Sequence, residues 1–286
     1  MQMRKKITVY TFALLGVLVL FNACKKEYES IQSIDDTKIQ DYIKKNNLTM
    51  TKDPTGVYYQ VLTQGTGTSL LNKDSVFYNL KISSLSGSNY YTTTAFSNEG
   101  TYLGYISPSS YRTALDGVKR GSKVLVILPS YLAYGKNGTA AVPSNEVIIS
   151  EISTYTEATQ WQIDDKRITD FLTAKGITAI KNPSRVYYKV NTVGTGATVD
   201  ISSIITVKYT GRLLNGTVFD QTTGDATFQS PLNNVIRGWN VLLGMQKGAK
   251  VRIFIPSDLA YGSSAQAAIP ASSVLDFDIE LVDVTN

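Results

Sequence analysis

The feature that most constrains the fold of this chain is an internal duplication. Ile34-Asp35-Asp36 recurs as Ile163-Asp164-Asp165, at an offset of 129 residues. Farther along, Leu132-Ala133-Tyr134-Gly135 recurs as Leu259-Ala260-Tyr261-Gly262, at an offset of 127 residues. A repeat this long is typical of two domains in tandem, because the units of solenoid proteins are only about 20–50 residues long. We therefore expect two similar domains, with their boundary near residues 156–160.

Each copy begins with a helical pattern and continues with strands. In the second copy, Ile163, Phe171 and Leu172 recur at helical spacing until Gly176 stops the helix. Later segments alternate apolar and polar residues, as in residues 275–281, which indicates antiparallel strands with one solvated face. A short helix is expected around residues 237–245. These patterns predict an α+β fold in which each domain is a curved antiparallel sheet wrapped over a short helix, with an extra N-terminal helix per repeat.

The N-terminus has the layout of a secretory signal peptide. Basic residues 4–6 precede an apolar run over residues 7–21, and Cys24, the one cysteine of the chain, follows shortly after. We predict a signal peptide over residues 1–23, a lipid on the thiol of Cys24, and a lipid-anchored tether over residues 24–33. The alternative is an uncleaved signal anchor, but about 15–17 apolar residues are few for a membrane-spanning helix. We expect the protein in the cell envelope, lipid-anchored to the outer membrane on its periplasmic or surface face.

The composition excludes several kinds of chemistry. The sequence contains no histidine and a single cysteine, so Ser-His-Asp and Cys-His nucleophiles, His-ligated metals and intramolecular disulfides are impossible within it. The formal net charge is +5, yet no block of Lys and Arg is interleaved with aromatic residues. We therefore expect no nucleic-acid partner, no metal and no cofactor.

Five segments of the second copy, in order, resemble motifs of the FKBP-type peptidyl-prolyl cis/trans isomerases. The first two resemble strand motifs of that family, the third the start of its helix, and the fourth the loop that overhangs its pocket. The resemblance covers residues 186–284 and implies that residues 159–286 are an FKBP-type isomerase domain. The segments are Val207-Lys208-Tyr209-Thr210-Gly211, Thr217-Val218-Phe219-Asp220, Val235-Ile236-Arg237-Gly238-Trp239, Leu259-Ala260-Tyr261-Gly262, and Ile269-Pro270 followed by Phe277.

The same resemblance implies a shallow, mostly aromatic pocket. Trp239 forms its floor, and the Ile236 N–H and the Tyr261 hydroxyl donate to substrate carbonyls. Each residue taken singly also fits a plain core or turn position, and only their joint spacing favours a pocket. Ala226 and Ala265 stand where the family commonly has an aromatic residue and a histidine, which widens the pocket. The implied catalytic residues are Tyr209, Phe219, Asp220, Ile236, Trp239, Tyr261 and Phe277, and the implied substrate-binding residues are Val235, Ile269 and Phe228.

The first copy, residues 34–158, is interpreted as a degenerate FKBP-like domain. Of the residues that the resemblance implies for the pocket, the first copy retains two tyrosines, Tyr78 and Tyr134. Residues 88–94 contain no Phe-Asp pair, and Ser150 replaces Phe277. Either Tyr111 or Arg112 stands near the position of Trp239. We therefore predict a structural or binding copy that lacks catalysis.

The isomerase interpretation agrees with the absence of histidine from the sequence, because the reaction needs no nucleophile, metal or redox group. Rotation about an X–Pro bond costs about 18–20 kcal/mol because it breaks amide resonance, and no covalent chemistry is needed. The predicted function is isomerisation of X–Pro bonds during folding of exported envelope proteins, with proline-containing polypeptides and the membrane as partners. Two alternatives stay open: a chaperone or binding module in which turnover is incidental, and a scaffold of an envelope complex.

Overall fold

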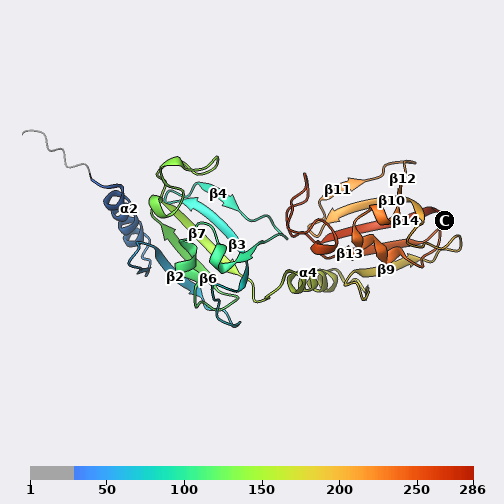
Figure 1. Cartoon of the computed structure of the whole chain (residues 1–286), viewed down its shortest axis with the longest axis horizontal. Coiled ribbons are helices and arrows are strands. Elements are labelled where there is room, and N and C mark those ends of the chain that lie inside the picture. Colours follow the sequence, from blue (N-terminus) through green and yellow to red (C-terminus); the bar gives the residue numbers. More distant parts are fainter. Residues whose placement is uncertain (1–28) are drawn as a thin grey trace, which may run out of the picture.

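The computed structural model describes residues 29–286, which form two antiparallel sheets with the same strand order (Figure 1). The first sheet runs β1-β2-β6-β7-β3-β4, with β5 paired to β3. The second runs β8-β9-β13-β14-β10-β11, with β12 paired to β10. We call the parts built on these sheets the first and the second domain. Their identical topology is what the internal duplication predicts, and the antiparallel sheets with few helices are confirmed.

The elements of each domain follow one another in the same order. The first domain contains α2 (Ile31–Lys45), β1 (Thr51–Lys52), β2 (Tyr58–Thr63), β3 (Ser75–Ser84), β4 (Asn89–Thr92), β5 (Glu99–Tyr102), η1 (Leu103–Tyr105), α3 (Tyr111–Leu115), β6 (Lys123–Leu128), η2 (Ser130–Leu132), η3 (Gly135–Asn137) and β7 (Ile148–Thr154). The second contains α4 (Gln160–Lys175), β8 (Ile180–Lys181), β9 (Tyr187–Thr192), β10 (Ile204–Leu213), β11 (Val218–Gln221), β12 (Phe228–Pro231), η4 (Leu232–Asn234), η5 (Arg237–Leu242), β13 (Lys250–Ile255), η6 (Ser257–Leu259) and β14 (Leu275–Thr285).

The predicted signal peptide, Cys24 and the first part of the tether lie outside the described residues. Within residues 29–286, the helices are all too short or too polar to cross a membrane.

The N-terminal helix of each domain is set by local signals. In α4, the Thr159 side chain accepts from the backbone of Gln162, whose own side chain reaches back to Thr159, forming a capping box. Gly176 ends the helix with a left-handed φ of 62°, as the sequence predicts. The apolar face of α4 buries Ile168 and Leu172 against the sheet.

The repeated Ile-Asp-Asp motif docks this helix onto its domain. The buried Asp164 carboxylate accepts from the backbone N–H of Ser257 at 2.8 Å and from its hydroxyl at 2.6 Å. Asp35 makes the same two bonds to Ser130 at the same distances. The motif recurs because both helices need a buried acceptor at this place.

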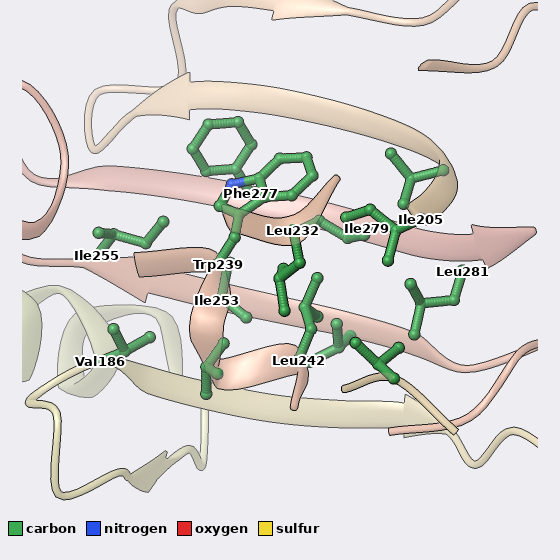
Figure 2. Close-up of a cluster of buried hydrophobic side chains, with 14 of the residues drawn as sticks. Val186, Ile205, Leu232, Trp239, Leu242, Ile253, Ile255, Phe277, Ile279 and Leu281 are labelled. Atoms are coloured by element: carbon green, nitrogen blue, oxygen red, sulfur yellow. The ribbon is translucent and has the colours of Figure 1, made fainter. Parts of the chain in front are cut away.

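Each domain has its own hydrophobic core. In the second domain, η5 lies across one face of the sheet and is a 3₁₀ helix that ends at Leu242, earlier than the predicted helix over residues 237–245. Gly244, at φ 80°, turns the chain away just after it. Figure 2 shows core side chains gathered between η5 and the sheet; they include Val186, Ile205, Leu232, Trp239, Leu242, Ile253, Ile255, Phe277, Ile279 and Leu281.

One arginine joins the two domains. Arg167 of α4 is 11% exposed, and its guanidinium donates to the carbonyl of Ser97 in the first domain at 2.8 Å. It also donates to the carbonyl of Ser272 in the second domain at 3.0 Å and to the Tyr155 hydroxyl at 2.9 Å. Beside it, the Ser97 hydroxyl donates to the carbonyl of Ala271 at 2.5 Å. The junction therefore includes directed hydrogen bonds from α4 to loops of both domains and one hydrogen bond between loops.

Candidate functional site

A pocket of about 330 Å³ opens in the second domain. Strands β10, β11, β12 and β14 contribute its walls, η5 its floor, and the loop after η6 one side. It is lined by Tyr209, Phe219, Asp220, Phe228, Asn234, Val235, Ile236, Trp239, Tyr261 and Phe277.

Aromatic rings meeting edge to face form most of this pocket. Trp239 lies at its base with ring-centroid distances of 5.7 Å to Tyr209 and 5.5 Å to Phe277. Phe219 meets Phe277 at 5.5 Å, with ring planes at 84°. Such pairs prefer these near-perpendicular arrangements, and they hold one another in place. The result is a rigid apolar slot.

The indole N–H of Trp239 is buried beneath this slot. Within residues 29–286 it has no hydrogen-bond partner. Figure 2 shows the indole nitrogen beside the ring of Phe277, and the two ring planes lie at 82°.

The rings can approach so closely because Gly211 on β10 has no side chain. A Cβ placed there would lie 2.7 Å from carbons of both Phe219 and Phe277. This position therefore requires glycine for the close approach of two rings, and the pocket depends on it.

A tyrosine–carboxylate pair forms one edge of the pocket. The Tyr209 hydroxyl donates to the Asp220 carboxylate at 2.5 Å. Burial, that hydrogen bond and the negative charge of Asp220 raise the pKa of Tyr209 well above its usual range. The hydroxyl therefore stays protonated and holds the exposed carboxylate against the pocket wall.

Two donors are left free at the rim. Within residues 29–286, no group accepts a hydrogen bond from the Ile236 N–H or from the Tyr261 hydroxyl. Tyr261 is 39% exposed, so its hydroxyl can reach a bound ligand. An aromatic slot with two donors at its edge can hold an apolar ring and the carbonyls that flank it.

The structure brings together all the residues predicted to form the pocket except Ile269. Ile269 is 6% exposed, belongs to the hydrophobic core and does not line the pocket. Asn234 lines the pocket and was missed, although it ends the turn that leads directly into Val235 and Ile236. Ala226 and Ala265 are exposed and lie outside the lining. In the described part of the chain, no group of three His, Cys, Asp or Glu residues lies close enough to hold a metal ion.

The first domain has a pocket at the equivalent place. Strand pairing defines the equivalence, since Ser150 on β7 pairs with Ile82 on β3 as Phe277 on β14 pairs with Gly211 on β10. The glycine and the phenylalanine of the second domain are therefore an isoleucine and a serine in the first.

The same register corrects one sequence interpretation. Leu80 pairs with Ile152 as Tyr209 pairs with Ile279, so Leu80, and not Tyr78, stands at the position of Tyr209. The first domain lacks both that hydroxyl and the phenylalanines around it.

Tyr111 rather than Arg112 takes the place of Trp239 in the first domain, since it contacts Ser150 as Trp239 contacts Phe277. Tyr111 is 0% exposed, and its hydroxyl shares a 2.6 Å hydrogen bond with the hydroxyl of Ser150. Arg112 is exposed. A buried hydrogen-bonded pair thus replaces the Trp239–Phe277 contact of the second domain.

Comparison with protein families places a match in the second domain. The model of the family described as FKBP-type peptidyl-prolyl cis-trans isomerase matches residues 196–282. The chain is 45% identical over 106 residues to the FKBP-type peptidyl-prolyl cis-trans isomerase FkpA of Aeromonas hydrophila, covering 35% of this chain and 38% of that protein. It therefore spans less than half the length of this curated relative.

Solved structures give similar matches. The crystal structure of FkpA from Escherichia coli is 32% identical, with a TM-score of 0.40, over 43% of this chain and 58% of that one. The crystal structure of a peptidyl-prolyl cis-trans isomerase from Pseudomonas syringae is 33% identical, with a TM-score of 0.39, over 46% of this chain and 99% of that one.

Proposed function

The chain belongs to the FKBP-type peptidyl-prolyl isomerase family, and on this premise we propose that its second domain catalyses cis/trans isomerisation of X–Pro bonds in polypeptides. The observation that carries this proposal is the pocket itself. Interlocked rings of Tyr209, Trp239 and Phe277 form an apolar slot, and at its rim stand two donors that no acceptor among residues 29–286 engages.

The proposed mechanism is preferential binding of the twisted amide. The planar amide is stabilised by resonance, which makes it polar and gives rotation a barrier of about 18–20 kcal/mol. A dry aromatic slot accepts the prolyl ring but solvates the polar planar amide poorly, so the less polar twisted form gains relative to it. The Ile236 N–H and the Tyr261 hydroxyl hold the flanking carbonyls while the bond turns.

The rim also has a polar side. Asp220 is exposed and is held in place by Tyr209. A fixed carboxylate beside the slot favours positive charge that faces it, such as a peptide N–H that turns toward it during rotation.

We further propose that the clients are exported polypeptides and that the protein acts in the cell envelope, anchored through a lipid on Cys24. The basic start, apolar run and following cysteine of the sequence support this location.

The decisive experiment is a protease-coupled assay on a short X–Pro peptide with the full-length protein. Phe219→Ala and Asp220→Ala should lower turnover at least about tenfold, equivalent to ~1.4 kcal/mol. Val218→Ala is the matched control, because Val218 lies on the same strand, is 45% exposed and does not line the pocket. Absence of turnover in the unchanged protein would instead favour the binding-module alternative.

A further inference from the structure

The pocket of the first domain, which we call the first-domain pocket, is not an eroded copy of the second. Its volume is about 520 Å³, against about 330 Å³ in the second domain. Tyrosines dominate its lining, and Glu99 is the one charged side chain among the described residues that form it. The tyrosines are Tyr78, Tyr90, Tyr91, Tyr105 and Tyr134.

The carboxylate of Glu99 stands where the second domain has an aromatic wall. Glu99 on β5 pairs with Tyr78 as Phe228 on β12 pairs with Val207. The Tyr91 hydroxyl donates to Glu99, and burial together with this carboxylate raises the pKa of Tyr91 to about 12. The hydrogen bond fixes the negative charge at the pocket wall, in a lining that it shares with the tyrosines.

The donors at the rim are retained in the first domain. Ser107 follows η1 as Ile236 follows η4, and no group within residues 29–286 accepts from the Ser107 N–H. Tyr134 stands in the repeated Leu-Ala-Tyr-Gly motif at the position of Tyr261, and it lines the pocket. The groups that face a ligand's backbone are thus the same in both domains, whereas the groups that face its side chain have changed.

The lining of the first-domain pocket is suited to a positively charged side chain. A carboxylate at the wall of an aromatic pocket offers a guanidinium or ammonium group both an ion pair and contact with ring faces. No Lys or Arg lines this pocket in the described part of the chain to compete for Glu99. A prolyl ring gains nothing comparable, since Leu80 and Ser150 replace two rings of the slot.

We propose that the first-domain pocket binds extended polypeptide segments by a Lys or Arg side chain, without isomerising them. The assignment of a polypeptide ligand rests on the proposed function, because there the same two donors hold peptide carbonyls. The assignment of the cation rests on Glu99 and the tyrosines alone. The first domain then holds a client by a basic residue while the second acts on a nearby proline, and the linkage raises the local client concentration.

The test is fluorescence anisotropy with the full-length protein and two labelled peptides. One is a proline-free heptapeptide with a central arginine, and the other carries neutral citrulline in its place. The arginine peptide should bind about tenfold more tightly, and Glu99→Gln should abolish that difference. Gln keeps an acceptor for Tyr91, so the fold is preserved. Glu151→Gln is the matched control, because Glu151 also lies in the first domain but outside this pocket, beside Lys123.

A second pair of variants tests the aromatic lining. Tyr105 is 83% exposed and lines the pocket, so Tyr105→Ser should weaken arginine-peptide binding without unfolding the protein. Tyr102→Ser is its control, because Tyr102 is 56% exposed and lies outside the pocket.

The outcomes separate this proposal from the proposed function. Equal binding of the two peptides, or a selectivity that survives Glu99→Gln, would overturn the cation site. Turnover of an X–Pro peptide is measured on the same samples and should be unchanged by Glu99→Gln. If the unchanged protein shows no turnover but binds the arginine peptide in a Glu99-dependent way, only the proposed function is refuted.

Discussion

Replacing Gly211 by alanine should damage the pocket of the second domain while leaving the fold in place. The added Cβ would lie 2.7 Å from ring carbons of Phe219 and Phe277, closer than packed carbons come. Alanine is normally favoured over glycine within a strand by roughly 0.5–1 kcal/mol, because glycine loses more backbone entropy on folding. Overpacking a core costs about 1–3 kcal/mol. We therefore expect a net loss of about 0–2.5 kcal/mol in the free energy of unfolding. Most domains stay folded after a loss of this size.

The effect on catalysis should be larger than the effect on stability. Phe277 is 4% exposed and has little room to move, so the clash displaces rings that shape the slot. A misplacement of about 1 Å in a catalytic site can cost 10²-fold in rate. Turnover of a short X–Pro peptide should fall at least about tenfold, while urea denaturation still shows one cooperative transition for this domain.

A double variant tests the reason for the effect. Phe277→Ser introduces the residue that the first domain has at this position, and it removes one ring that the new Cβ would meet. Gly211→Ala should then cost less in the Phe277→Ser background than alone, with a coupling of about 0.5–3 kcal/mol. Strict additivity, or a Gly211→Ala protein with native turnover, would refute the argument from close approach.

Three further changes test other parts of the structure. Burial raises the pKa of the Asp164 carboxyl above its ordinary 3.8, so the folded state binds the carboxyl proton more tightly than the unfolded state does. The free energy of unfolding should therefore fall as the pH rises from 3.8 through the raised pKa. Asp164→Asn should remove that fall, measured as urea midpoints from ~pH 4 to ~pH 7. Arg167→Met should loosen the domain junction and speed limited proteolysis near residues 156–160, whereas Lys166→Met, at an exposed position on the same helix, should not. Cys24→Ala should abolish labelling by a radioactive fatty acid in cells, and persistent labelling would contradict the lipid-anchor prediction.

Much of the fold was predictable from local patterns. The strand alternation and the helix stop at Gly176 each depend on residues close together in the sequence, and the duplication can be read by comparing the chain with itself. The pocket of the second domain was predictable for a different reason, because five segments in order resemble motifs of the FKBP-type family and the resemblance implies the pocket. Ile269 shows the limit of that approach, because a position within a motif does not reveal whether a side chain points into the pocket or into the core.

The sequence alone predicted two copies of one antiparallel domain, and its resemblance to a known family implied an aromatic pocket in the second copy. Only the tertiary structure decided what the first copy contains. A register shift of two residues leaves the inward and outward alternation of a strand unchanged. The alternation by itself therefore does not distinguish Tyr78 from Leu80 as the first-domain counterpart of Tyr209. The placement of Glu99 depends in turn on the pairing of β5 with β3, a contact between segments distant in the chain. Side-chain periodicity reports which face a residue occupies, whereas cross-strand pairing decides which residues meet there.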